Sequence, residues 1–153
     1  MPLIIATGTN LTERSEHLSW ARDQLSVHFR LIAQSRIYQS AAVDYEAQPE
    51  FLNQVLQFSL PWQRPEDVMK ILLNIEQDRG RVRQITRGPR TLDLDILFWG
   101  TDFIQSTTLI TPHPRWKQRS FVVRPLSELP FWHLIEKCFT IPESFDVEAF
   151  PHS

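Results

Sequence analysis

Cysteine is almost missing from this chain, since Cys138 is the only one among 153 residues. A single cysteine excludes an internal disulfide framework and argues against a zinc site built from thiolates. Free cysteine is among the most buried residue types, so we expect Cys138 to lie in the core. Only four glycines occur, and each is expected at the boundary of a helix or strand. They are Gly8, Gly80, Gly88 and Gly100.

Strong charge of one sign and long apolar runs are also absent. The formal net charge of −2 provides no overall attraction to nucleic acid or to an anionic membrane. No apolar run reaches the length of a membrane-spanning helix, and residues 1–7 lack the charged flank of a secretory signal. We therefore expect a cytoplasmic protein that binds neither nucleic acid nor membranes. With 42% apolar and 22% charged residues, residues 1–153 are expected to form one globular domain and a monomer.

The most informative stretch is a strand-like run with two aspartates at residues 92–98. Alternate side chains of a strand point to opposite faces, so Asp93 and Asp95 share one face. The opposite, apolar face carries Leu92, Leu94, Ile96 and Phe98. The two carboxylates are about 7 Å apart along such a strand, close enough to bind one hard cation or a bridged pair. The alternative is a solvated edge strand whose two acids have no function.

An arginine-rich segment precedes this strand. Five of the sixteen basic residues fall within twelve positions, namely Arg79, Arg81, Arg83, Arg87 and Arg90. Carboxylates suited to a metal, next to arginines, are typical of a site for a polyphosphate bound as its magnesium salt.

The run Gly88-Pro89-Arg90-Thr91-Leu92-Asp93-Leu94-Asp95-Ile96-Leu97 resembles the signature of the 6-hydroxymethyl-7,8-dihydropterin pyrophosphokinase family. Members of this family transfer a diphosphate from ATP to a pterin alcohol in the folate pathway. Residues 7–11, 48–53 and 111–129 are also similar to the family, so the resemblance covers about residues 3–129.

The chain departs from the family in two segments. The segment between Arg81 and Arg90 is one residue shorter than in well-known members. Within it, Gln84 replaces a common basic residue, and Arg87 stands where many members have tryptophan. Residues 39–47 lack the usual proline and glycine. These departures bear on loop closure and turnover more than on the metal site.

The resemblance implies a role for each candidate residue. Asp93 and Asp95 would bind two magnesium ions, and Arg81 and Arg90 would act with them in catalysis. Aromatic rings and an amide suit a flat heterocycle, while basic side chains suit phosphates. The expected pterin-binding residues are Phe51, Asn53, Asp93 and Phe121. The expected ATP-binding residues are Glu76, Arg83, Ile96, His113, Arg115 and Arg119.

Structural roles stay open for several of these residues. Without the resemblance, Phe51 and Asn53 are an edge phenylalanine and an amide near a turn. Glu76 can be a solvated helix acid or the ion-pair partner of a nearby arginine. His113 can be an ordinary loop histidine, and Phe121 an ordinary core residue.

The order of expected elements is strand, helix, strand, strand, helix, strand, which indicates a ferredoxin-like α+β sandwich. Strands are expected at residues 3–7, 30–38, 51–60 and 92–98, with a hairpin and return strand over 98–104. The first helix buries Leu11, Leu18, Ala21 and Leu25, and the second runs from Pro65 to Gly80. Both helices should cover one face of an antiparallel sheet, leaving the aspartate face as the site. Residues from 130 onward would pack on the sheet as a C-terminal extension.

Three functions are consistent with these patterns. The first is magnesium-dependent transfer of the β,γ-diphosphate of ATP to 6-hydroxymethyl-7,8-dihydropterin, with these two small molecules as the partners. The second is a noncatalytic relative that binds pterin or nucleotide without forming AMP. The third is an RNA-binding domain, but such domains carry aromatic residues on their central strands. Here Asp93 and Asp95 would repel RNA phosphates, so the first function is the prediction.

Overall fold

The structure is a computed structural model that describes residues 1–10, 14–40, 51–83 and 92–152, without the side chains of residues 14 and 80–83. The strands are β1 (Pro2–Thr9), β2 (Leu31–Gln34), β3 (Tyr38–Ser40), β4 (Phe51–Ser59), β5 (Asp93–Trp99), β6 (Ile104–Gln105), β7 (Ile110–Thr111) and β8 (Phe150–Pro151). The helices are α1 (Arg14–His28), α2 (Pro65–Arg83), the 3-10 helix η1 (Trp116–Gln118), α3 (Ser120–Leu126) and α4 (Trp132–Cys138).

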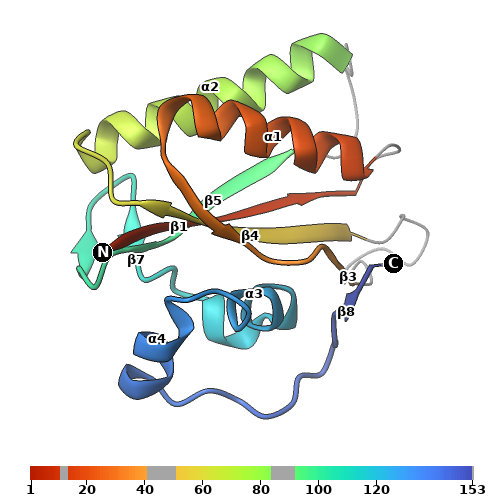
Figure 1. Cartoon of the computed structure of the whole chain (residues 1–153), viewed down its shortest axis with the longest axis vertical. Coiled ribbons are helices and arrows are strands. Elements are labelled where there is room, and N and C mark those ends of the chain that lie inside the picture. The colour runs from red at the N-terminus through yellow and green to blue at the C-terminus, as the bar shows by residue number, and fades with distance from the viewer. Residues whose placement is uncertain (11–13, 41–50, 84–91, 153) are drawn as a thin grey trace.

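The main sheet is antiparallel and has the strand order β5-β1-β4-β3-β8, with β2 also paired to β4. α1 and α2 cover one face of this sheet, and α3 and α4 lie on the other (Figure 1). The predicted ferredoxin-like α+β fold is confirmed. The C-terminal extension lies on the face opposite α1 and α2, and it covers part of the face that carries the aspartates.

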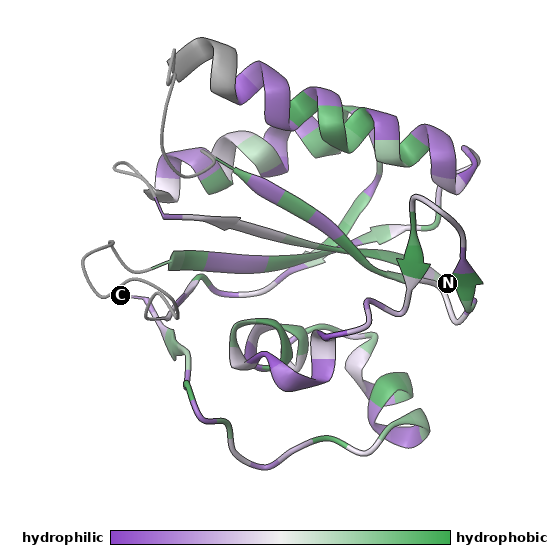
Figure 2. Cartoon of the chain, turned by 180° about the vertical axis from the view of Figure 1, so that it is seen from behind, coloured by the Kyte–Doolittle hydropathy of each residue, from purple (hydrophilic) through white to green (hydrophobic). Residues whose placement is uncertain are grey.

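One core lies between the sheet and helices α1 and α2. The helical spacing of apolar residues turns one face of each helix inward, and polar residues alternate with them along both helices (Figure 2). The inward residues include Leu18, Ala21 and Leu25 of α1 and Val68, Leu72 and Ile75 of α2, which meet Leu92, Leu94 and Ile96 of the sheet. The predicted helix faces are confirmed for these residues, while Leu11 lies outside the described residues.

A second core lies between the sheet and the C-terminal segments, and it corrects the prediction for Phe98. The pairing of β1 with β5 shifts register between Ile4 and Ile5, as at a β-bulge. A bulge adds one residue and reverses the alternation of side chains. Phe98 therefore faces α3 and α4 instead of sharing the face of Leu94. Its ring packs edge-on against Trp116, with 5.3 Å between the two ring centres.

The predicted strand at residues 30–38 forms two strands, β2 and β3, which are interrupted at Ser35. The hydroxyl of Ser35 accepts a hydrogen bond from the Val55 amide at 3.0 Å, and the side chain of Gln54 donates to the Ser35 carbonyl at 2.7 Å. Side-chain hydrogen bonds thus replace part of the ladder to β4, and this local competition divides the strand.

Two predicted boundaries at glycines are wrong. Gly8 lies inside β1, and Gly80 lies inside α2, which continues to Arg83. An isolated glycine costs a helix only about 1 kcal/mol, which the packing of α2 on the sheet offsets. Gly100, with φ of 56°, follows β5 as expected, and Gly88 lies outside the described residues.

Three further predictions need correction. The return strand β6 pairs with β7 in a separate two-stranded sheet and not with β5. Alternation in the predicted strand at residues 51–60 placed Leu60 on the core face, but Leu60 follows the end of β4 and is 37% exposed. Cys138 is exposed, because it lies in the last turn of α4 on a side that the core does not cover. Within the part of the chain that the structure describes, none of the helices has the length and apolar character needed to cross a membrane.

Candidate active site

The two aspartates of β5 lie on one face of the sheet, as predicted. Asp95 is exposed and Asp93 is half-buried, while the intervening Leu94 is buried on the opposite face. This part of the sheet face is polar, whereas its other part is covered by α3 and α4 through Ile4 and Val55. The carboxylates thus lie beside the covered region on an open part of the sheet.

Glu76 of α2 fixes the segment between the two aspartates. Its carboxylate accepts a hydrogen bond from the Leu94 backbone amide at 2.8 Å. β5 is at the end of the strand order of the described sheet, so the outward amides of this strand need partners other than a neighbouring strand. Glu76 supplies one, and it thereby holds the backbone that carries Asp93 and Asp95. Its expected contact with ATP stays a prediction.

A row of paired residues crosses the sheet and includes Asp93. Gly8 of β1 pairs with Asp93 on one side and with Asn53 of β4 on the other. Paired residues of an antiparallel sheet point to the same face, so Asn53 and Asp93 flank Gly8 about 10 Å apart. A Cβ atom at Gly8 would lie 2.8 Å from Oδ1 of Asn53. Gly8 therefore provides the space in which the Asn53 amide lies.

From the sequence, Gly8 was expected at an element boundary and within residues 7–11, which resemble the family, but it was given no role in the site. The signal that could have identified it is a glycine inside an apolar strand, which often marks the close approach of another group.

His113 lies beside the outer edge of β5. Its backbone amide donates to the Leu97 carbonyl at 2.9 Å, and its Nδ1 accepts from the Arg115 amide at 3.2 Å. Burial lowers the pKa of His113 below 6.5; the charge of Asp95 acts against this shift, and those of Arg119 and Arg115 add to it. The neutral ring therefore carries its hydrogen on Nε2, where it can donate to an acceptor such as a phosphate oxygen.

Arg119 and Phe121 lie at the start of α3. The guanidinium carbon of Arg119 is 5.6 Å from the centre of the Phe121 ring, a cation–π contact. Phe121 is partly buried against the second core. Packing thus fixes one part of this ring. The charge of Arg119 also acts on His113, as does the charge of Asp95.

The other predicted residues are placed as follows. Phe51 begins β4, is half-buried and pairs with Ser40 of β3. The side chain of Ile96 is buried under α1 and α2, away from the face that carries the aspartates, and its expected contact with ATP stays a prediction. Arg81 and Arg83 belong to the last turn of α2, and nothing is described of their side chains. Arg90 lies outside the described residues.

Within the described part of the chain, no group of three or more His, Cys, Asp or Glu side chains forms a metal cage by itself. Asp93 and Asp95 are two oxygen donors on one strand face. This donor set suits a hard cation that completes its coordination with waters and substrate oxygens.

Comparison with known proteins identifies the family. Residues 4–130 match the family model of 7,8-dihydro-6-hydroxymethylpterin-pyrophosphokinase. The chain is 37% identical over 127 residues to the 2-amino-4-hydroxy-6-hydroxymethyldihydropteridine pyrophosphokinase of Bacillus subtilis, covering 82% of this chain and 75% of that protein. It is 38% identical over 127 residues to the Pseudomonas aeruginosa protein of the same name, covering 82% of this chain and 78% of that protein.

A longer relative also matches. The chain is 39% identical over 128 residues to the folic acid synthesis protein fol1 of Pneumocystis carinii, and the match covers 82% of this chain but only 17% of that protein. On the match over residues 4–130 and these identities, this chain belongs to the 7,8-dihydro-6-hydroxymethylpterin-pyrophosphokinase family.

Proposed function

We propose that this chain transfers the β,γ-diphosphate of ATP to the hydroxymethyl group of 6-hydroxymethyl-7,8-dihydropterin, giving AMP and the pterin diphosphate. The single observation that carries the proposal is the polar region of the sheet, where two family motifs meet. Asp93 of one motif lies in a row with Gly8 and Asn53, Asp95 lies two residues further along the same strand, β5, and His113 of the second motif is bound to the edge of β5. The names of the relatives supply the reaction.

Asp93 and Asp95 fit a magnesium site, and we propose that they bind Mg²⁺ together with the phosphates of ATP. Mg²⁺ prefers oxygen ligands and commonly takes one or two carboxylates, with the remaining positions filled by water and substrate. When bound, the two expected ions would neutralise phosphate charge and favour attack at phosphorus. The hydrogen bond from Leu94 to Glu76 keeps the backbone of this pair in place.

The residues divide between the two substrates. His113 Nε2–H and the Arg119 guanidinium are hydrogen-bond donors, and the charges of Asp95 and Arg119 both act on His113, so these two residues suit the phosphates of ATP. Asn53 offers an amide to the edge of the pterin, and Phe121 offers a ring face for stacking. The Asn53 amide lies over Gly8 and in the same row as Asp93, a place from which it can meet the edge of a flat heterocycle on this face of the sheet.

In the proposed reaction, the hydroxymethyl oxygen forms a bond to the β-phosphorus of ATP. The bond from that phosphorus to the α,β-bridging oxygen breaks, AMP leaves with the electron pair, and the hydroxyl proton is released. Enzymes of this type accelerate transfer mainly by positioning the reactants and stabilising charge. The test is AMP formation that requires both magnesium and the pterin; ATP hydrolysis that ignores the pterin would reject the proposal.

Substitution of Gly8 by alanine should weaken pterin binding about tenfold while leaving the fold stable. The added Cβ would lie 2.8 Å from Oδ1 of Asn53, so this flexible side chain has to move. Losing one hydrogen bond of about 1.4 kcal/mol corresponds to a factor of ten in affinity. The measurement is the pterin Kd by calorimetry.

Gly100→Ala is the matched control. Gly100 has a φ of 56°, so alanine there should lower the free energy of unfolding by about 1 kcal/mol without changing the pterin Kd. Unchanged pterin affinity in Gly8→Ala would contradict the role of this space.

The pH dependence of stability should report on His113. Because its pKa is lowered in the folded chain, His113 contributes stability that is present above 6.5 and is lost as the pH falls through the folded pKa. In His113→Asn this loss should disappear, so the stability of the variant should fall less between pH 7 and pH 5. Denaturant unfolding of both proteins at each pH measures the difference. Parallel curves would show that His113 does not titrate as described.

A further inference from the structure

Tyr38 extends the row of site residues by one strand. It pairs with Asn53, which pairs with Gly8, which pairs with Asp93, so the row crosses β3, β4, β1 and β5. Because paired residues share a face, the Tyr38 ring lies on the same face as Asn53 and Asp93. It is 6% exposed, and the proposed function gives it no part.

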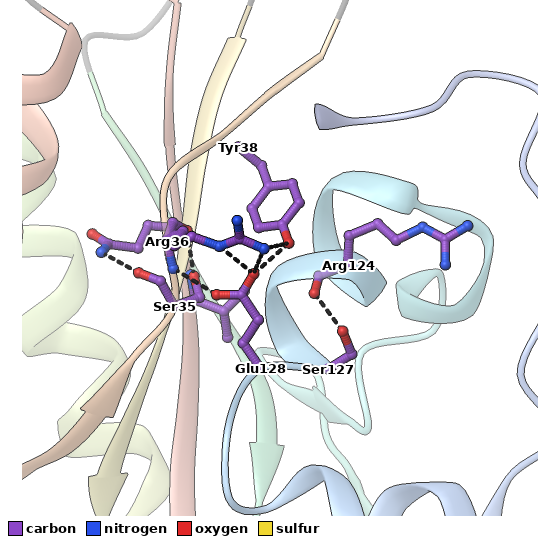
Figure 3. A network of polar contacts seen from close by, with 8 residues as sticks. Ser35, Arg36, Tyr38, Arg124, Ser127 and Glu128 are labelled. Carbon is purple, nitrogen blue, oxygen red and sulfur yellow. Dashed lines mark hydrogen bonds and ion pairs between the residues drawn. The ribbon is translucent and has the colours of Figure 1, made fainter. Parts of the chain in front are cut away.

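The hydroxyl of Tyr38 is bound by Glu128, just beyond the end of α3. The Glu128 carboxylate accepts hydrogen bonds from the Tyr38 hydroxyl, from the Arg36 amide at 2.9 Å and from Arg36 Nε at 3.0 Å. Figure 3 shows the three side chains converging from β3, from the segment before it and from the end of α3. One carboxylate thus connects the edge of the sheet to the C-terminal segments.

Glu128 is itself bound to α3 through the backbone. Its amide donates to the Pro125 carbonyl at 3.1 Å, which continues the last turn of the helix. Phe121 lies near the start of the same seven-residue helix, and α3 contacts both β3 and β4. A short helix moves as a unit, so a shift at Glu128 changes the position of Phe121 over the strand that carries Asn53.

We propose that Glu128 is a positioning residue of the pterin site, which sets the place of Phe121 relative to Asn53 through its contacts with Arg36 and Tyr38. The proposal rests on the proposed function, because it assigns the pterin to the space between these two residues. Glu128 does not touch the substrate in this account.

The charge of Glu128 matters for this role. Burial alone would raise the pKa of its carboxyl, but the hydrogen bonds from Arg36 and Tyr38 outweigh burial and lower the pKa below 4.5. The group is therefore ionised at neutral pH and accepts from every donor around it. A glutamine has the same shape, but its amide nitrogen would face a donor of Arg36 or Tyr38.

Glu128→Gln tests the proposal, with Glu148→Gln as the matched control. Like Glu128, Glu148 forms an ion pair with an arginine, in its case Arg124 of α3 at 2.6 Å, and its side chain is 30% exposed compared with 23% for Glu128. It makes no hydrogen bond to Arg36 or Tyr38 among the described contacts. Glu128→Gln should raise the KM and Kd for pterin about tenfold and change those for ATP less than twofold, whereas Glu148→Gln should change neither. Tyr38→Phe keeps the ring and removes the hydroxyl that donates to Glu128, so it should also raise the pterin Kd.

Three results would overturn the proposal: equal rises in the KM for pterin and ATP, the same effect from Glu148→Gln, or a lower melting temperature of Glu128→Gln without loss of pterin affinity.

Hydrogen exchange without ligands tests the contact independently of activity. Faster exchange at residues 36–40 and 121–126 in Glu128→Gln than in Glu148→Gln supports the positioning role, and equal exchange contradicts it. If the unmodified chain forms no pterin-dependent AMP, the proposed function fails, and hydrogen exchange still decides whether Glu128 positions α3.

Discussion

Asp95→Ala should lower the rate of AMP formation by about a thousandfold or more while the chain stays folded. Stabilisation of transferred charge by a metal is worth several kcal/mol, and each 1.4 kcal/mol corresponds to a factor of ten in rate. The side chain of Asp95 is exposed at the sheet surface, so its removal opens no cavity in either core. The measurement is kcat together with the dependence of ATP binding on magnesium concentration.

Asp102→Ala is the control for this experiment. Asp102 is an exposed acid in the turn that follows β5, at the end of the strand away from the Asp93–Asp95 pair. Its loss should leave kcat within twofold of the unmodified chain. Near-normal turnover in Asp95→Ala, with the same magnesium requirement, would reject the assignment of the metal to this strand.

Phe121→Ala should raise the Kd for pterin by about tenfold to a hundredfold and change the Kd for ATP much less. Stacking of a base-like ring on an aromatic side chain is worth about 1–3 kcal/mol, which corresponds to this range. Calorimetric titration with each substrate measures the two constants separately. An equal loss of affinity for both substrates would reject the stacking role.

Phe121→Leu separates stacking from packing. Phe121 is partly buried against the second core, so truncation to alanine also costs stability. Leucine keeps most of the buried volume but has no aromatic face. It should restore the melting temperature more than it restores pterin affinity; full recovery of affinity would show that apolar bulk alone is required.

The parts of the fold that periodicity specifies were predicted correctly. The inward stripes of α1 and α2 and the alternation of Asp93, Leu94 and Asp95 follow from helix and strand geometry, and the structure bears them out. Local rules failed where a tertiary contact decides the outcome. The hydroxyl of Ser35 interrupts the strand predicted at residues 30–38, and a bulge in the pairing of β1 with β5 turns Phe98 to the other face.

The candidate site shows the same division. The carboxylates of Asp93 and Asp95 and the amide of Asn53 were predicted from motifs, because the residue type alone determines the chemistry of each side chain. Gly8 and Glu128 were missed, since the role of each depends on a neighbour distant in sequence, Asn53 for Gly8 and Tyr38 for Glu128. The helix α3 was also missed, because Pro125 within it argues locally against helix.

Phosphorus NMR of the reaction products shows whether this chain transfers the diphosphate as one unit. The reaction would contain the chain, ATP, magnesium and 6-hydroxymethyl-7,8-dihydropterin, with a control that lacks the pterin. We expect one AMP for each pterin diphosphate, no ADP, and no AMP in the control. Formation of ADP with a pterin monophosphate, or the absence of AMP from a folded chain that binds both substrates, would contradict it.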